Sequence, residues 1–249
     1  METGLAPEVW TLREVQRVPL APAHDVEHWG ETLVLAPNPH DASLGCGGAI
    51  ALLRQRGVNV TIAVITDGRA SHPDSRLYPA SVLIEQRQQQ VLDAAATLGV
   101  DESEVQFLQL EDFQINKLSP RQKAFLIKRL RSLVKRTKTV LTPWRLDPNC
   151  DHRATFGYTL AAVGELPVRI LEYPIRLWQN GVPADYPPRA NFSILRLDIS
   201  TVLPRKVLAF SAHHSQPDDG VSKDSNQFRS FPQVLSESQP PWELFFSRK

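Results

Sequence analysis

Short apolar runs of strand length alternate along the chain with longer segments in which apolar residues recur at helical spacing. The predicted strands are residues 32–36, 59–66, 105–110, 139–142, 168–173 and 193–199. The predicted helices are residues 44–56, 81–98, a segment that starts at 119–120 and reaches at least 134, 151–163 and 200–211. This alternation favours a three-layer α/β/α sandwich around a mostly parallel, Rossmann-like sheet, because parallel strands need crossover connections.

Glycine and proline positions set the expected helix boundaries. Gly57 stops the first helix, and Pro120 takes the first helical position of the third. The helix expected at 200–211 must hold Pro204 in its first turn. A polar, proline-containing stretch at 215–241 predicts an irregular surface segment.

Composition and charge narrow the class of protein. A chain of 249 residues with 42% apolar and 22% charged residues can bury a large core, which excludes a mainly disordered or coiled-coil protein. Its 28 Lys and Arg nearly balance 27 Asp and Glu, so the net charge gives no reason to expect nucleic-acid or membrane binding. The two cysteines cannot form a disulfide framework, and the first residues are too charged for a signal peptide. No apolar run approaches the ~18 residues of a membrane span, so we expect a soluble cytoplasmic protein of undetermined oligomeric state.

Ligands of open α/β sheets bind beyond the carboxyl ends of the strands. In this chain the loops that follow predicted strands are residues 37–43, 67–78, 111–117 and 143–152. These loops are therefore the places to search for chemistry.

The loop after the first strand has a distinctive sequence. Residues 36–48 are Ala-Pro-Asn-Pro-His-Asp-Ala-Ser-Leu-Gly-Cys-Gly-Gly. This stretch resembles the entry motif A-P-H-P-D-D-E-x-x-G-C-G-G of the LmbE-like, or PIG-L, family of zinc-dependent N-acetylglucosamine deacetylases. The resemblance implies the fold of that family and hydrolysis of an N-acetyl amino-sugar conjugate.

Further stretches agree with the resemblance and occur in the family's order. They are Thr-Asp-Gly at 66–68, Ser-His-Pro at 71–73, Pro-Trp-Arg-Leu-Asp-Pro-Asn-Cys-Asp-His-Arg-Ala at 143–154, His-His-Ser-Gln at 213–216 and Trp-Glu-Leu-Phe at 242–245. The resemblance thus implies one domain over residues 1–249, with its core at about 30–246.

Several residues of the first loop depart from the family pattern. The first histidine ligand of the family falls on Asn38, the general-base aspartate on His40, the aspartate ligand on Asp41 and the next acid on Ala42. A neutral amide is a poor substitute for imidazole on zinc. His40 could instead act as the base or serve as a replacement ligand.

In the later loop the oxyanion histidine of the family falls on Asn149, and the last histidine ligand falls on His152. The resemblance therefore implies a metal set of Asn38, Asp41 and His152, with His40 and Asn149 as catalytic residues. Cys150 is a further possible donor. Zinc is the implied cofactor, and we expect its binding to be weakened by the substitutions.

Four more residues match family positions that line the sugar site. They are Arg87, Asp112, Arg145 and His213. Arg87 could equally pair with Glu85 or be solvated. His213 and His214 are adjacent, so at most one of them can face the site from a regular element.

Each motif residue also has a purely structural interpretation. His40 could hydrogen-bond only to the backbone. Asp41 and Asp151 could cap the helices that follow them, and the motif glycines could serve close packing of helix against strand. Cys46 is expected to be a packed thiol among small residues.

A basic stretch runs from Lys128-Arg129 to Lys138 and includes Arg131, Lys135 and Arg136. The apolar face of the same helix is expected to consist of Phe125, Leu126, Leu130, Leu133 and Val134. The favoured interpretation is a solvated helix surface, and nucleic-acid binding is the alternative.

Two hypotheses about function remain open. The first is a divergent hydrolase that acts on small N-acetyl amino-sugar conjugates with a degraded metal site. The second is a catalytically inactive relative that binds a sugar ligand or a protein partner. Loss of a general base lowers a rate by about 10²–10⁴, and loss of an oxyanion donor lowers it by about 10²–10³, so whether the chain is an enzyme stays undecided at this point.

Overall fold

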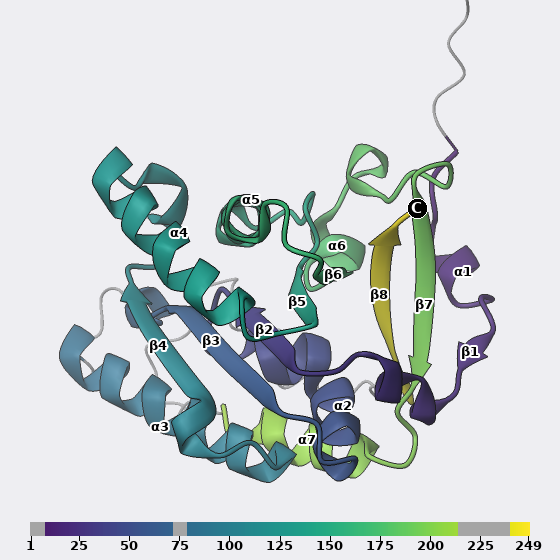
Figure 1. Ribbon diagram of the computed structural model, residues 1–249, viewed down its shortest axis with the longest axis horizontal. Helices are drawn as coiled ribbons and strands as arrows, with labels where there is room; N and C mark the ends of the chain where they lie inside the picture. The colour runs from purple at the N-terminus through teal and green to yellow at the C-terminus, as the bar shows by residue number, and fades with distance from the viewer. Residues whose placement is uncertain (1–7, 72–78, 214–239) are drawn as a thin grey trace, which may run out of the picture.

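An eight-stranded sheet forms the centre of the computed structural model, which describes residues 8–71, 79–213 and 240–249 (Figure 1). The strands are β1 (Leu20–Ala21), β2 (Thr32–Ala36), β3 (Val60–Thr66), β4 (Val105–Leu110), β5 (Thr139–Pro143), β6 (Arg169–Tyr173), β7 (Phe192–Asp198) and β8 (Trp242–Arg248). Their order across the sheet is β1-β7-β8-β6-β5-β2-β3-β4. All neighbouring pairs are parallel except those of β8, which runs antiparallel to both β6 and β7.

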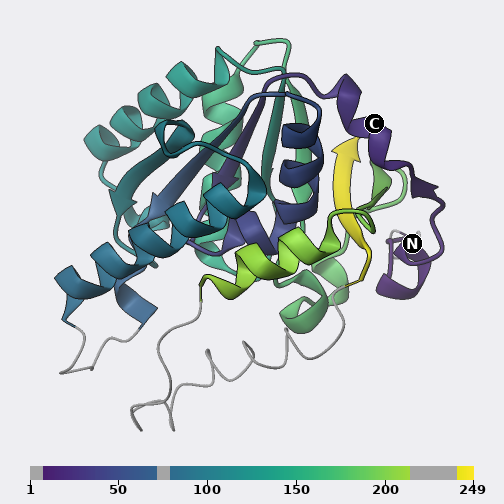
Figure 2. The ribbon, with the colours of Figure 1, turned by 90° about the horizontal axis from the view of Figure 1, so that it is seen from below.

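Helices cover both faces of the sheet. They are α1 (Leu12–Val15), α2 (Asp41–Gln55), α3 (Ala80–Leu98), α4 (Pro120–Val134), α5 (Cys150–Val163), α6 (Leu177–Asn180) and α7 (Leu203–Ser211). Figures 1 and 2 show α2, α3 and α7 together on one face, and α4 and α5 on the other. The expected three-layer sandwich with a mostly parallel sheet is confirmed. No helix in the described part of the chain is long and apolar enough to cross a bilayer.

The central strand β2 supplies side chains to both layers of the core. Leu33 and Leu35 pack with the helices α4 and α5, whereas Val34 and Ala36 pack with α2 and α3. Successive side chains of a strand point to opposite faces, so a strand covered on both sides is apolar throughout. This explains why residues 32–36 form an uninterrupted apolar run with no polar alternation.

The connections of the sheet reverse direction beside β2. From β2 the chain first adds β3 and β4 on one side, and it then returns to add β5 and β6 on the other. Such a reversal opens a crevice at the carboxyl ends of the two adjacent strands, where α/β proteins bind ligands. The loops after β2 and β5, which carry the two main motifs, therefore meet at this point.

Two glycines of the motif allow α2 to lie very close to the sheet. A Cβ atom on Gly45 would lie 2.4 Å from Cδ2 of Tyr173, and one on Gly48 would lie 2.5 Å from Cγ2 of Ile199. Contacts that short are not tolerated, so both positions require a residue without a side chain. The close-packing role expected for the glycines is confirmed at these two positions.

The structure corrects several expected boundaries. The helix α2 begins at Asp41, three residues before the predicted start. The helix α7 begins at Leu203, three residues after the predicted start, and Pro204 lies in its first turn as expected. The strands β1 and β8 were not predicted, because β1 has two residues and β8 follows the long polar stretch. Most of the stretch 215–241 lies outside the described residues. Phe125 was placed on the apolar face of its helix and is instead 65% exposed.

Candidate functional site

Three polar groups converge where the loop after β2 meets the beginning of α5. Nδ2 of Asn38 lies 3.1 Å from Oδ2 of Asp41 and 3.2 Å from Nε2 of His152. The same Oδ2 and Nε2 atoms are 3.1 Å apart, so the three atoms form a nearly equilateral triangle. Asp41 and His152 are completely or almost completely buried. The three residues expected to form the metal set are therefore brought together.

Asp147 holds His152 from the other side. Oδ1 of Asp147 lies 3.0 Å from Nδ1 of His152 and also accepts from the backbone N–H of Asn149, while Oδ2 accepts from the N–H groups of Ile175 and Arg176. A carboxylate bonded to the far nitrogen of a ligand histidine fixes its orientation and raises its basicity. Sequence reasoning quoted Asp147 within its motif but gave it no role.

The buried charges shift one another's pKa values. Burial opposes the charged form of His152, but the adjacent carboxylates of Asp41 and Asp147 outweigh it and raise the His152 pKa to about 10. Burial would raise the pKa of Asp41, yet His152 and the Asn38 backbone hold it well below its usual range. Without a cation the group is therefore an imidazolium between two carboxylates.

His40 is placed differently from His152. It occupies the N-cap position of α2 without a side-chain capping bond, and its Nε2 atom lies 3.5 Å from Oδ1 of Asp41. Burial lowers the pKa of His40 to about 4, against the opposing effect of Asp41. The ring is thus neutral at pH 7 and 20% exposed, so it can accept a proton from a water molecule at the edge of the site.

Zinc is the cofactor implied by the resemblance, and the triangle provides a test of whether it fits. Bonds of 2.0–2.1 Å in a tetrahedral zinc site place ligand atoms roughly 3.4 Å apart, close to the 3.1 Å between Oδ2 of Asp41 and Nε2 of His152. Oδ1 of Asp41 is buried and has no hydrogen-bond partner among the described residues. The described residues contain no group of three His, Cys, Asp or Glu side chains arranged for a metal, so Asn38 would have to turn its amide oxygen inward to complete the set. The donors fit a weakly held cation.

The first residues of α5 and α2 correct the expectation that Asp151 and Asp41 cap these helices. Asn149 is the N-cap residue, and its side-chain oxygen accepts from the N–H of Asp151 at 2.8 Å. Asp151 therefore does not cap the helix; it accepts from the N–H of Phe113 at 2.7 Å. Asp41, likewise, is the first residue of its helix and not the cap. The side chain of Asn149, expected to be catalytic, is held by a structural bond.

Arg87 and Asp112 lie buried beside the loop after β3. Asp112 accepts from the backbone N–H groups of Gly68 and Ala70, and burial raises its pKa. Arg87 is 7% exposed and donates to Gln90 at 2.7 Å, and burial lowers its pKa against the attraction of Asp112. The alternatives of a solvated Arg87 or a pair with Glu85 are not favoured by this arrangement.

Arg145 and His213 each contact other side chains that hold them in place. Arg145 forms an ion pair with Glu172 and covers the rings of Phe156 and Phe192. Nε2 of His213 is 3.1 Å from Oγ of Ser43, two residues after Asp41. His214 lies outside the described residues. Their role toward a substrate is taken up below.

Sequence reasoning missed a second buried charge cluster, formed where β8 crosses under α2. The carboxylate of Glu243 accepts from the N–H groups of Gly48 and Ala49 and from Nζ of Lys206 at 2.7–2.8 Å. Lys206 and Glu243 are 5% and 3% exposed. The Trp-Glu-Leu-Phe motif was the available signal, but nothing in its spacing revealed a partner on α7.

The fold is a doubly wound α/β sheet with an Asn-Asp-His triangle at its reversal point. The sequence profile of the PIG-L family, described as GlcNAc-PI de-N-acetylase, matches residues 33–163, so the chain belongs to that family. No curated protein sequence matches the chain.

Solved structures agree with this fold. An N,N'-diacetylchitobiose deacetylase from Pyrococcus horikoshii has a TM-score of 0.65 and 21% identity, covering 94% of this chain and 88% of that one. The conserved protein TT1542 from Thermus thermophilus has a TM-score of 0.58 and 25% identity, covering 86% and 93%. GalB, a 4-carboxy-2-hydroxymuconate hydratase from Pseudomonas putida, has a TM-score of 0.61 and 18% identity, covering 88% and 95%. Because a hydratase and a deacetylase have this fold, the reaction must be argued from the site.

Proposed function

We propose that this protein is a divergent hydrolase that releases acetate from small N-acetyl amino-sugar conjugates, with His40 as the general base. The observation that carries the proposal is the pair formed by His40 and Asp41 at the start of α2. The imidazole of His40 is neutral at pH 7 and partly exposed beside a carboxylate, so it can accept a proton from water, while its lowered pKa makes it a weak base. Family membership supplies the substrate class.

The remaining residues have proposed roles around this base. Asp41, His152 and Asn38 would hold the cation, which when bound polarises the acetyl carbonyl and acidifies water. His40 takes the proton from the attacking water and returns it to the amine that leaves. Asp147 is a positioning residue that keeps Nε2 of His152 directed at the triangle.

The substrate would be bound by the four residues that match family positions lining the sugar site. They are Arg87, Asp112, Arg145 and His213. Arg145 is held in place by Glu172, so it would present a fixed donor to a sugar hydroxyl without reordering its long side chain. Asn149, whose oxygen caps α5, would have only its amide N–H group left to donate to an oxyanion.

The substitutions predict a slow reaction. Loss of an imidazole ligand weakens the cation, and loss of one oxyanion donor lowers a rate by about 10²–10³. Acetate release from N,N'-diacetylchitobiose and N-acetylglucosamine glycosides, measured with and without zinc, tests the proposal. We expect slow release that disappears in His40→Ala and persists in His24→Ala, which removes an exposed histidine of the segment before β2. No release above buffer with any substrate or divalent metal would overturn it.

A second candidate is a non-catalytic relative that binds an amino-sugar ligand. It is favoured by Asn38, whose amide nitrogen faces both Asp41 and His152 and can satisfy them without a cation. For this candidate, calorimetry detects sugar binding while wild type releases no acetate. The triple change Asn38→His, His40→Asp and Asn149→His should then create zinc-dependent release.

A further inference from the structure

The charge of this chain is distributed very unevenly. Residues 120–138 contain eight of the 28 Lys and Arg residues and none of the 27 Asp and Glu residues, which leaves 20 basic against 27 acidic residues elsewhere. A nearly neutral protein thus carries a strongly positive segment on α4 and just after it. The net charge of +1 for the whole chain therefore gives no indication of this basic segment.

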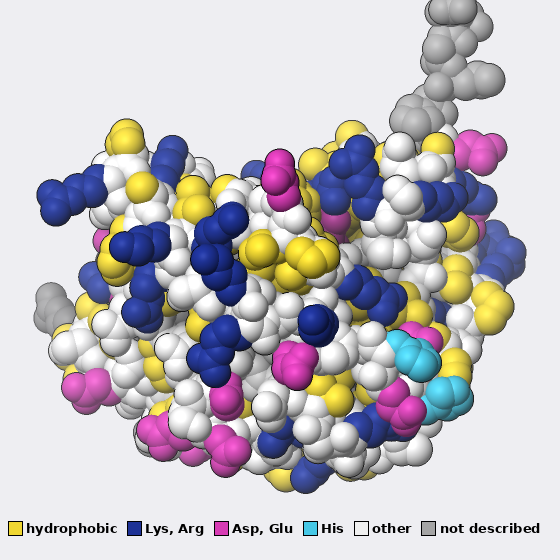
Figure 3. Space-filling model, viewed as in Figure 1, with side chains coloured by type: hydrophobic (Ala, Val, Ile, Leu, Met, Phe, Trp, Pro, Cys, Tyr) yellow, Lys and Arg dark blue, Asp and Glu magenta, His cyan; other side chains and the backbone are white. Residues whose placement is uncertain are grey.

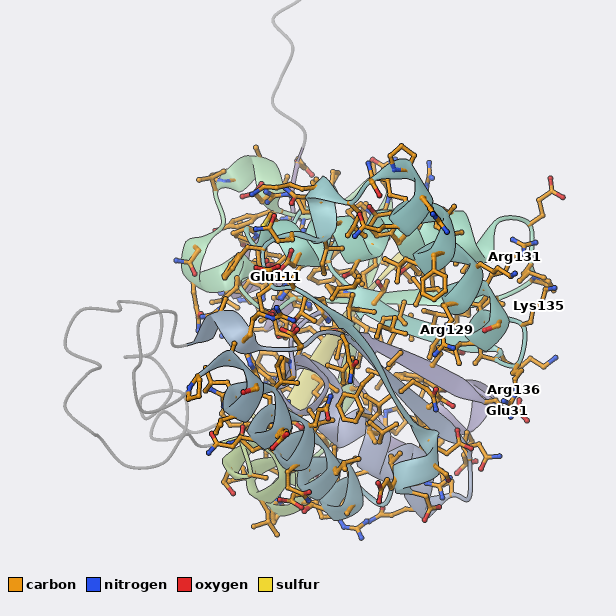
Figure 4. The ribbon with its side chains drawn as sticks, turned by 90° about the vertical axis from the view of Figure 1, so that its left-hand side faces the viewer. Glu31, Glu111, Arg129, Arg131, Lys135 and Arg136 are labelled. Carbon is orange, nitrogen blue, oxygen red and sulfur yellow. The ribbon has the colours of Figure 1, made fainter. Side chains whose placement is uncertain are left out.

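The structure spreads these charges over one exposed face. Leu126, Leu130 and Val134 turn toward the sheet, and the opposite side of α4 is exposed. Its exposed basic residues, here called the α4 basic face, are Arg121, Lys128, Arg129, Lys135 and Arg136. Figure 3 shows Lys and Arg side chains gathered over this part of the surface. Figure 4 shows Arg131, Lys135 and Arg136 at one edge of the molecule, with Glu31 beside Arg136 and Glu111 away from them.

The folded chain does not account for this charge. Among the described residues, no carboxylate lies within ion-pair distance of any of the eight basic side chains. Arg121 and Lys123 lie in the first turn of α4, where positive charge opposes the helix dipole and no acid compensates it. Arg131 and Lys135, four residues apart, repel each other. Of the eight, only Arg131 has a side-chain hydrogen bond within the part of the chain that the structure describes, and it donates to the carbonyl of Ala162 at the end of α5.

An exposed aromatic ring lies on the same face. Phe125 is 65% exposed, between Arg121 and the Lys128-Arg129 pair, and Leu160 on the adjacent helix α5 is 46% exposed. A nucleic-acid duplex or an acidic peptide would use the charges alone, and a single strand would stack a base on Phe125 without using Leu160. A bilayer surface also offers an apolar layer beneath its charged headgroups, so it matches both features.

We propose that the α4 basic face docks this protein on an anionic lipid surface, with Phe125 entering the headgroup layer and the basic side chains contacting lipid phosphates and carboxylates. The long axis of α4 then lies along the membrane. The proposal is independent of any catalytic activity.

Sedimentation with lipid vesicles tests the docking. We expect the full chain to bind vesicles with about 30% phosphatidylserine and not pure phosphatidylcholine vesicles, and to dissociate when salt rises from about 50 mM to about 500 mM. Equal binding to both vesicle types, or no binding to either, would overturn the proposal. Tighter binding to duplex DNA or transfer RNA than to the anionic vesicles would also overturn it in favour of a polyanion.

Matched variants locate the surface. The test variant combines Lys128→Gln, Arg129→Gln, Lys135→Gln and Arg136→Gln, and the control combines Arg13→Gln, Arg17→Gln, Arg205→Gln and Arg248→Gln, which are also exposed. Both remove the same charge. We expect the test variant to lose on the order of 100-fold in vesicle partitioning and the control to lose less than about threefold. Equal losses would mean that net charge alone acts, and the α4 basic face would be rejected.

The apolar contact is tested separately with single substitutions. Phe125→Ser should lower partitioning by about tenfold at the lower salt concentration, because it removes the ring that enters the headgroup layer and no charge. Leu208→Ser, at a residue of α7 that is 61% exposed, is the control and should have no effect. Unchanged partitioning of Phe125→Ser would rule out insertion of the ring. The α4 basic face would then be a site for polyanions and not for a lipid surface. Thermal melting checks that each variant is folded.

Discussion

Gly48→Ala should destabilise the protein although it lies in a helix, where alanine is normally the better residue. In the interior of an exposed helix this exchange stabilises by about 0.5–1 kcal/mol. At Gly48, however, a Cβ atom would lie 2.5 Å from Cγ2 and 2.7 Å from both Cβ and Cδ1 of Ile199. The side chain of Ile199 is fully buried and cannot turn away freely.

The magnitude follows from the two opposing effects. Overpacking a core by one methyl group destabilises by about 1–3 kcal/mol, which exceeds the gain in helix propensity. The substitution also pushes α2 away from Glu243, whose carboxylate accepts from the N–H of Gly48 at 2.7 Å. We therefore expect a net loss of about 1–3 kcal/mol in the free energy of unfolding.

Gly157→Ala is the matched comparison. Gly157 lies in the middle of α5, is exposed, and would place a Cβ atom with no neighbour within 4 Å. Equilibrium unfolding in urea should show Gly157→Ala to be equal to or up to about 1 kcal/mol more stable than wild type. In an Ile199→Ala background, Gly48→Ala should be better tolerated, since two of the three close atoms are gone. A Gly48→Ala protein as stable as Gly157→Ala would refute the close-packing argument.

Three more predictions concern buried polar groups. Asp147→Asn removes the carboxylate that faces Nδ1 of His152 and accepts from three backbone N–H groups, so it should lower the free energy of unfolding by about 3–5 kcal/mol in urea titrations. Lys206→Met leaves the Glu243 carboxylate buried without its ion-pair partner, and calorimetry should show a loss of about 3 kcal/mol, partly recovered when Glu243→Gln is added. The Cys46 thiol is fully buried, and burial raises its pKa, so it should react with a disulfide reagent only after unfolding. Cys150, which is partly exposed, should react in the native protein.

Each of these predictions has a control or a contradicting result. Asp101→Asn, at an exposed position, should change stability by no more than about 0.5 kcal/mol, and an equal effect of Asp147→Asn would show that its bonds do not matter. A Lys206→Met protein as stable as wild type would mean that the backbone N–H groups alone satisfy Glu243. Rapid reaction of both thiols in the native protein would place Cys46 nearer to solvent than described.

The three-layer architecture was predictable because the strands of the parallel part are short and rich in apolar residues, and helix-length segments separate most of them along the chain. The strand β8 was not, although four of the five residues from Trp242 to Phe246 are apolar. It is antiparallel, and it pairs with strands that lie far from it in the chain. Period and composition describe one segment at a time, and they carry no information about which distant strand will accept it.

Part of the candidate site could be predicted from the sequence, and part of it could not. Asn38, Asp41 and His152 were expected together because the family resemblance implies that they form one metal set, and their loops follow strands of the same parallel sheet. The contact between Asp147 and His152 depends on the turn before α5, and the exposure of Phe125 depends on how α4 rotates over the sheet. Both are set by packing between elements, so the spacing of residues along the chain could not reveal them.

The position of β8 has a consequence for how the protein matures. It occupies the gap between β6 and β7, and its Glu243 fastens the helix that begins with Asp41. During synthesis the loop that bears Asn38 leaves the ribosome early, but the sheet beneath it cannot close until residue 248 has followed. Nascent chains stalled shortly before β8 should therefore be sensitive to protease in α2, however complete their earlier strands are.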